Sequence, residues 1–143
     1  MILAAAVAGA VLAGRSVPRA RIARGVGPVR AAGAVALVAG AALDLAAMAA
    51  MRRHDTGVRP DRAASALVTT GPFARTRNPI YVGNTLALIG LGLLTRNPWF
   101  LAAAPVAAVA VDRLAIRREE RHLAARFGEA WAAYARATPR WLI

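Results

Sequence analysis

The sequence predicts an all-α fold: a polytopic membrane bundle of about four helices followed by a C-terminal amphipathic helix. Two observations support this prediction. The 143-residue chain is 58% hydrophobic with a mean hydropathy of +0.45, yet its formal net charge is +12. A soluble domain of this size would leave much of that apolar surface in water. The charge is also segregated, because the arginines gather between long apolar runs.

Four apolar runs predict the membrane helices: Met1–Gly14, Ala31–Met51, Ile80–Thr95 and Trp99–Val111. A helix that crosses the bilayer needs about 20 apolar residues. The second run has this length, whereas the third and fourth reach it only by continuing into their flanks, the fourth as far as Ile116. The first run is short and lacks the charged start of a secretion signal. This favours a short first helix over a cleaved signal peptide, and it leaves open whether that helix spans the membrane.

The arginines predict the orientation of the bundle. The loop Arg52–Asn78 and the tail Asp112–Ile143 hold most of the 19 arginines. These two segments lie on one face if all four runs cross the membrane. The positive-inside rule then places that face, together with the N-terminus, on the cytoplasmic side of a cell inner membrane. The five arginines of Arg15–Arg30 fit this arrangement better if the first run does not span.

Helix boundaries are predicted by two Asn-Pro pairs, Asn78-Pro79 and Asn97-Pro98, because Asn caps a helix and Pro suits its first position. The third and fourth runs should therefore form a tight helical hairpin. The tail is predicted to be a long amphipathic helix that lies at the membrane interface or folds back onto the bundle. Its stripe at helical spacing comprises Ile116, Glu120, Leu123, Phe127, Trp131 and Tyr134.

Composition excludes several classes of site. Without cysteine there is no disulfide, no thiolate metal site and no cysteine nucleophile. His54 and His122 are the only histidines, so a multi-histidine zinc site is excluded and no metal is predicted. A pI near 12 suggests nucleic acid, but aromatic residues are only 6% of the chain. Because stacking platforms need aromatic side chains, no nucleic-acid partner is predicted.

The segment Gly71–Gly83 is the first candidate site. Its Gly-Pro pair makes a turn, two arginines approach the membrane face, and a helix starts at Asn78 with Tyr81 one turn inside. Backbone N–H groups at a helix start beside Arg77 suit a carboxylate or a phosphate. The equally weighted alternative is that Arg75 and Arg77 are interfacial anchors.

Small residues in the apolar runs have two interpretations. Gly83, Gly90 and Gly92 either let helices approach closely, which is the favoured interpretation, or form a flat wall against which a ligand lies. Ala10 and Gly14 indicate packing at most, and they leave the oligomeric state open.

The acidic pair Glu119-Glu120 is the second candidate site. Glu120 lies on the apolar stripe of the tail, Glu119 borders it, and neither has an arginine four residues ahead. Acids beside an apolar stripe at a membrane face are costly and indicate function, here the binding of a cationic group such as an ammonium. A structural salt link, of Glu120 to Arg117 or of Glu119 to His122, is the alternative. Asp44, inside the second run, and His54 receive no assigned role.

These motifs, in this order, resemble the integral-membrane methyltransferase superfamily of isoprenylcysteine carboxyl methyltransferases and phospholipid N-methyltransferases. Gly71–Gly83 is similar to the family's Gly-Pro-aromatic … Arg-[His/Asn]-Pro-x-Tyr-x-Gly signature. Asn78 stands where many members carry His, and Trp131 where Tyr is common. The resemblance covers residues 67–143 as a catalytic region, with residues 1–66 as N-terminal helices and basic loops of the same single domain. It continues through Gly90-Leu91-Gly92, Arg118-Glu119-Glu120, Phe127 to Tyr134, and Pro139-Arg140.

The resemblance implies S-adenosylmethionine as methyl donor, bound at the cytoplasmic ends of the last two membrane helices, and an acceptor that enters from the bilayer. The donor carboxylate suits Arg77, and its ammonium suits Glu119 or Glu120. Arg136 or Arg140 is expected to close over the site. The expected catalytic residues are Glu120, Tyr81 and Arg77. The expected cofactor-binding residues are Arg77, Asn78, Pro79, Tyr81, Gly83, Gly90, Gly92, Glu119, Glu120, Tyr134 and Arg140.

The favoured function is carboxyl O-methylation of an isoprenylcysteine-type acceptor, with phospholipid-amine N-methylation as the second candidate. A carboxylate is already a nucleophile at neutral pH, whereas an amine must first lose a proton to a base such as Glu120 or Tyr81. The alternative from another class is a non-catalytic membrane scaffold with glycine faces for helix association and arginines for anionic lipid.

Overall fold

The computed structural model describes residues 1–16, 26–54 and 66–142, and within them all regular structure is helical. This confirms the predicted all-α fold. The elements are α1 (Ile2–Ser16), α2 (Val26–Arg53), the 3₁₀ turn η1 (Gly71–Ala74), α3 (Pro79–Thr95), α4 (Pro98–Val111), the π-helical turn η2 (Asp112–Ile116) and α5 (Arg117–Ala137).

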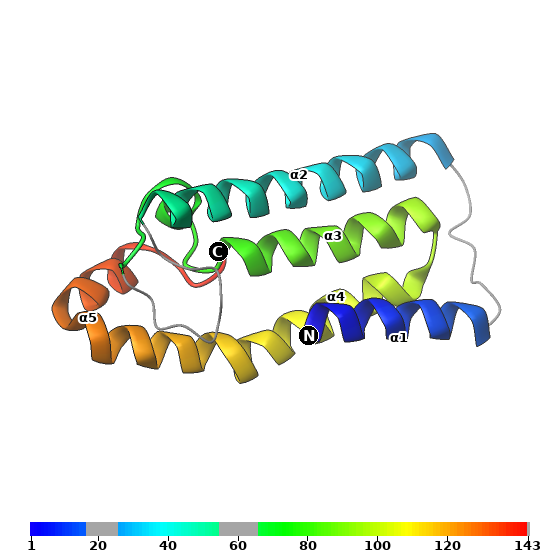
Figure 1. The fold of residues 1–143 in the computed structure, drawn as a ribbon. Coiled ribbons are helices and arrows are strands. Elements are labelled where there is room, and N and C mark those ends of the chain that lie inside the picture. The colour runs from blue at the N-terminus through cyan, green and yellow to red at the C-terminus, as the bar shows by residue number, and fades with distance from the viewer. Residues whose placement is uncertain (17–25, 55–65, 143) are drawn as a thin grey trace.

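The central helix of the bundle is α3 (Figure 1). It packs against α2 on one side and α4 on the other, and α1 packs on α4. The predicted hairpin of α3 and α4 is present, and Arg96 closes its turn in the left-handed conformation with φ 55°. The core where α1, α3 and α4 meet consists of Ala10, Leu88, Phe100 and Ala104.

Glycines on both helices form the seam between α2 and α3. A Cβ on Gly40 would lie 2.6 Å from the carbonyl oxygen of Gly83, and a Cβ on Gly33 would lie 3.0 Å from that of Gly90. Gly33 and Gly40 are seven residues apart on α2, and Gly83 and Gly90 are seven residues apart on α3. The same antiparallel contact between glycines therefore occurs twice along the seam. Close approach of this kind is what small residues allow in membrane helices. The packing interpretation of Gly83 and Gly90 therefore holds.

Two helices are long and apolar enough to cross a membrane, one over residues 27–53 and the other over residues 98–137. Only 17% and 22% of the residues in their apolar windows are buried, whereas the core helix of a soluble protein would be mostly buried. The fourth apolar run continues without a break to Ile116, as expected. The 14 residues of α4 and five of η2 span about 28 Å at the usual helical rise, close to the roughly 30 Å of bilayer hydrocarbon.

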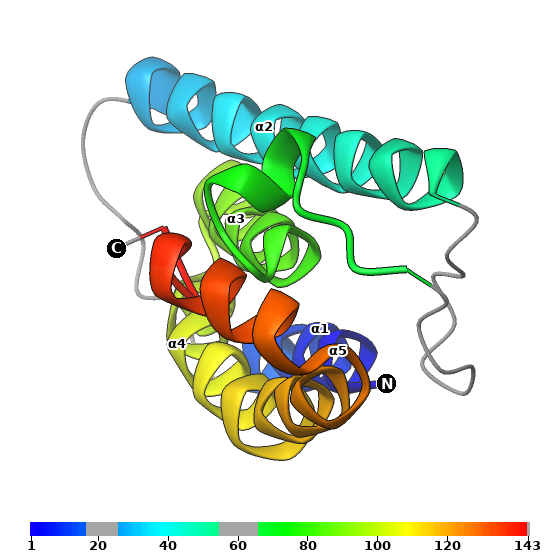
Figure 2. The same cartoon turned by 90° about the vertical axis from the view of Figure 1, so that its left-hand side faces the viewer.

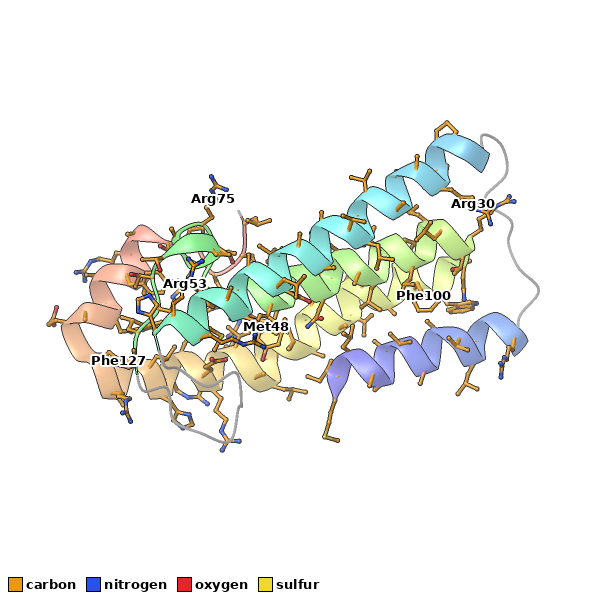
Figure 3. The ribbon with its side chains drawn as sticks, turned by 45° about the horizontal axis from the view of Figure 1, so that its top comes forward. Arg30, Met48, Arg53, Arg75, Phe100 and Phe127 are labelled. Carbon is orange, nitrogen blue, oxygen red and sulfur yellow. The ribbon has the colours of Figure 1, made fainter. Side chains whose placement is uncertain are left out.

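The described parts of the basic central loop and the tail lie at the same end of the bundle. Arg53 and Arg75 are at the end that carries α5, and Arg30 is at the opposite end (Figure 3). The arrangement on which the orientation was predicted is therefore present, while the orientation itself stays a prediction. Further arginines of the two basic loops, Arg19, Arg21, Arg24, Arg59 and Arg62, lie outside the described residues.

The two Asn-Pro pairs start their helices differently. The side chain of Asn97 accepts a hydrogen bond from the Trp99 N–H at 3.0 Å, which confirms it as a cap, and it donates to the Ala10 carbonyl at 3.1 Å. Asn78 also precedes a helix-initiating proline, but its side chain makes no capping bond. The prediction that Asn78 caps α3 through its side chain is wrong, because that amide is bonded to the C-terminal segment instead.

The tail helix leaves the bundle and then folds back. α5 continues the line of α4 past the start of α3, and its last turns return over that start (Figures 1 and 2). The reversal occurs at Gly128, whose φ of 50° and ψ of −121° are non-helical. Of the two predicted alternatives, folding back onto the bundle is therefore the one observed. Trp131 and Tyr134, after the reversal, are buried.

Candidate active site

The site is built first from the loop between η1 and α3. Gly71 adopts a φ of 62°, which favours glycine, and Pro72 follows it at the start of η1. The chain then turns into α3 through Thr76, Arg77 and Asn78. Thr76 is completely buried and Asn78 is 8% exposed, so the segment that carries Arg77 is held between packed neighbours.

The C-terminal segment is bonded along this loop. The Arg77 N–H donates to the Pro139 carbonyl at 2.9 Å. The Arg140 carbonyl accepts two further bonds, from the Thr76 hydroxyl and from the Asn78 side-chain amide, both at 3.0 Å. The start of α3 and the end of the chain, more than 60 residues apart in sequence, therefore form one unit.

Three predicted site residues meet in a charge cluster. Arg77 forms an ion pair with Glu120, with 3.2 Å between Nη1 of the arginine and Oε1 of the glutamate. Arg140 binds the same carboxylate with two nitrogens, Nε to Oε1 at 3.0 Å and Nη2 to Oε2 at 2.6 Å. The side chains of Arg77 and Glu120 are each only 14% exposed. The bond to Glu120 raises the pKa of Arg140 above its ordinary value. Both oxygens of Glu120 are thus occupied by arginine.

One hydrogen-bond donor of Arg77, its Nε–H, has no acceptor among the described residues. Its guanidinium lies over the ring of Trp131, 5.6 Å from the ring centroid, which is a cation–π geometry. Its Nε is buried and makes no hydrogen bond to any described residue. A buried N–H without an acceptor is costly and calls for an explanation, and an anionic ligand would supply the missing acceptor.

Tyr134 joins the end of α5 to the loop that precedes α3. Its ring meets Trp131 edge-on at 5.8 Å between centroids, and its hydroxyl donates to the Phe73 carbonyl at 2.7 Å. Burial raises the pKa of Tyr134 to about 12. This hydroxyl stays protonated and bonded to the loop, so Tyr134 contributes to the shape of the site through its ring.

Glu119 differs from its neighbour Glu120. No arginine or histidine among the described residues lies within ion-pair distance of its carboxylate. The residue as a whole is exposed on α5, beyond the apolar part of the long helix. Its carboxyl group is nonetheless partly desolvated, and this effect together with the Glu120 charge raises the pKa of Glu119. Tyr81, another predicted site residue, lies in the first turn of α3.

Two residues of the site were missed from the sequence, Thr76 and Asp112. Thr76 lies inside the loop motif, where its hydroxyl accepts from the Asn78 N–H at 3.2 Å and donates to Arg140. Asp112 is the first acid after the fourth apolar run, and it binds Arg140 Nη1 at 3.4 Å and Arg117 Nε at 2.8 Å. Position in the motif was the only signal for Thr76, and the end of the apolar run the only signal for Asp112.

The three predicted cofactor glycines belong to helix contacts. The side of Gly83 that a side chain would occupy is filled by Asp44 and Gly40, that of Gly90 by α2, and that of Gly92 by Leu101 of α4. Neighbouring helices already take that space, which supports the packing interpretation, while the role of these glycines in cofactor binding stays a prediction.

Other predicted residues lie apart from the charge cluster or beneath it. Pro79 is almost completely buried at the start of α3. Asp44 has one buried oxygen without a partner among the described residues, and it faces α3 at Gly83. His54 Nε2 is 3.3 Å from the Thr70 hydroxyl. Of the two arginines expected to close the site, Arg140 reaches the charge cluster, while Arg136 is exposed.

Known proteins similar to this chain fall into two groups. Residues 29–130 match the phospholipid methyltransferase family. Two relatives are each 41% identical over 78 residues: the cobalt-zinc-cadmium resistance protein CzcN of Cupriavidus metallidurans and the nickel-cobalt-cadmium resistance protein NccN of Alcaligenes xylosoxydans xylosoxydans. The aligned part is 54% of this chain and 36% of each relative, so the chain spans only about a third of their length. No solved structure matches the chain significantly.

The family match covers the α2–α3 seam, the loop with Arg77, the helical hairpin and most of α5. These elements carry Arg77 and Glu120 of the charge cluster and the long apolar helices, whereas Arg140 lies beyond the matched residues. On this evidence the chain belongs to the phospholipid methyltransferase family of membrane proteins.

Proposed function

We propose that the protein transfers a methyl group from S-adenosylmethionine to a lipophilic acceptor held in the membrane. The observation that carries this proposal is the buried, unpartnered Nε of Arg77, in a chain of the phospholipid methyltransferase family; Glu119, next in sequence to the Glu120 that pairs with Arg77, has no ion pair among the described residues. An unused N–H donor on a guanidinium and an unpaired carboxylate suit the two charged ends of an amino-acid group, which the donor carries.

The contacts favour a division of labour between the two glutamates. Arg77 offers its free N–H to the donor carboxylate as a charge-assisted hydrogen bond. Glu119 offers its carboxylate to the donor ammonium, since no described residue neutralises it. Glu120 has no free oxygen, so we assign it to holding Arg77 and Arg140 in place. Asn78 and Pro79 shape the loop that presents Arg77.

When bound, the donor supplies an electrophilic methyl group on a sulfonium. The chain's own residues then need to orient the reactants and exclude water, because in-line displacement depends mainly on positioning. The rings of Trp131 and Tyr134, the buried loop and the returning end of α5 form a partly dry wall around Arg77. Exposed apolar faces of the helices give the acceptor a route from the bilayer.

Two acceptor chemistries have support. The arginines around the site favour an anionic acceptor, and a carboxylate of the isoprenylcysteine type needs no base. The family match favours a phospholipid amine, which must lose a proton. Glu120 is poorly placed as the base for that step, because both of its oxygens carry arginine bonds.

The test is methyl transfer from donor labelled in its methyl group. Purified protein in lipid nanodiscs is incubated with labelled donor and a membrane lipid extract, and the products are separated by chromatography. Label in a lipid fraction is the expected result, as a base-labile ester for a carboxylate acceptor or a base-stable amine for a phospholipid. Absence of protein-dependent label from every lipid and prenylated fraction would contradict the proposal.

A further inference from the structure

The site is held by an alternating chain of charges. Arg77 bonds Glu120, Glu120 bonds Arg140, and Arg140 bonds Asp112. Arg117 ends the chain with a 2.8 Å bond from Nε to Asp112 Oδ2. The two acids are 14–15% exposed and Arg117 is 48% exposed. The chain therefore runs from the surface at η2 to the buried guanidinium of Arg77.

The orientation of Arg140 is fixed at three nitrogens. Nε and Nη2 bind Glu120, and Nη1 binds Asp112. Its backbone carbonyl is held independently by Thr76 and Asn78. Because the planar guanidinium donates in fixed directions, Asp112 determines the angle at which Arg140 meets Glu120. Glu120 then bonds only Nη1 of Arg77, and Nε of Arg77 is left free.

The π-helical turn puts Asp112 in this position. Asp112 and Arg117 are five residues apart, and in an α-helix their side chains would diverge by about 140° around the axis. Within η2 the Arg117 N–H bonds the Asp112 carbonyl, a π-type bond. This register stacks the two side chains so that they pair. Single π turns inside α-helices occur frequently at functional sites.

We infer that Asp112 is a positioning residue for the methyl donor: through Arg140 and Glu120 it leaves Arg77 Nε free to bind the donor carboxylate. This inference rests on the proposed function, and Asp112 itself touches no ligand. Without the Asp112 charge, Arg140 can rotate away from Glu120. Glu120 can then accept hydrogen bonds from further nitrogens of Arg77, including Nε. The Nε–H is then no longer free for the donor carboxylate.

The test measures equilibrium binding of radiolabelled S-adenosylmethionine to the full chain in nanodiscs. We expect Asp112→Asn to weaken binding about tenfold and Asp112→Glu, which keeps the charge, to weaken it less. In an Arg140→Gln background, Asp112→Asn should cause no further loss. Asp44→Asn is the matched control, since Asp44 lies outside the charge chain, and it should leave affinity unchanged.

Each other outcome has a definite meaning. Wild-type affinity in Asp112→Asn would overturn the inference, as would losses that simply add when Asp112→Asn and Arg140→Gln are combined. If Asp112→Asn does not fold, the same comparison is made with Asp112→Glu, where additive losses again overturn it. Failure of the wild-type protein to bind the donor would instead contradict the proposed function, and the inference with it.

Discussion

At the scale of single residues, two adjacent glutamates have different environments. Glu120 is bonded by Arg77 and Arg140, whereas Glu119 has no ion pair among the described residues. The sequence showed that both acids lie near the apolar stripe of the tail. It could not show which one is neutralised, because that depends on Arg140, which reaches the site only after the chain reverses.

The two glutamates should therefore respond differently to loss of charge. Glu120→Gln leaves a mostly buried arginine pair short of an acceptor, so we expect it to lower the free energy of unfolding by roughly 1–3 kcal/mol and to weaken donor binding. Glu119→Gln should weaken donor binding with little change in stability. Thermal unfolding in detergent and donor-binding titrations measure both effects. Equal losses of stability in the two variants would contradict the assignment.

At the scale of elements, Gly128 decides where α5 ends up. Its φ of 50° and ψ of −121° lie in a region that residues with a side chain rarely enter. The reversal there brings Trp131 and Tyr134 onto Arg77 and Phe73. Helical periodicity predicted the stripe correctly on both sides of Gly128, but it predicts no reversal, because the spacing of apolar residues is preserved across it.

Gly128→Ala should destabilise the folded-back end of α5. A strained backbone of this kind costs roughly 1–3 kcal/mol. A Cβ at this position would have no neighbouring atom within 4 Å, so a steric clash does not contribute to the expected effect. Gly9→Ala is the matched control, because Gly9 also has no neighbour within 4 Å but lies inside a regular helix, where alanine is favoured. Limited proteolysis of the C-terminus should accelerate in Gly128→Ala alone. Equal protection of both variants would argue against the strain.

Other elements were predictable to different degrees. Asn97-Pro98 gave both the cap and the hairpin, since capping is local chemistry. Asn78-Pro79 started α3 as expected, but its amide went to the Arg140 carbonyl, a partner that no local pattern contains. The glycines of α3 were correctly placed on one face, whereas the matching glycines of α2 identify that face as a helix seam. The π turn at Asp112 has no sequence signal.

At the scale of the whole molecule, arginines are distributed unevenly between the two ends of the bundle. Arg15, Arg30 and Arg96 belong to the end opposite α5, while the described arginines after Met51, except Arg96, belong to the end that carries the site. The positive-inside rule predicts that the site faces the cytoplasm.

The natural absence of cysteine makes this orientation easy to measure. Arg118→Cys, on α5, should react with a membrane-impermeant maleimide in inverted inner-membrane vesicles and be protected in intact spheroplasts. Arg96→Cys, at the other end, should show the reverse pattern. Labelling of both positions from the same side would contradict the predicted crossing of α4, the helix between them, and a swapped pattern would contradict the cytoplasmic site.

The central claim is that Arg77 binds the anionic end of the methyl donor. The most direct measurement is titration calorimetry of the full chain with S-adenosylhomocysteine, the demethylated form of the donor, which keeps the same amino-acid group. We predict saturable binding heat for the wild-type protein and loss of that heat in Arg77→Ala. Arg75→Ala should leave the heat unchanged, because Arg75, two residues before Arg77 in the sequence, is exposed. Undiminished binding by a folded Arg77→Ala variant, or no binding by the wild-type protein at saturating ligand, would contradict the claim.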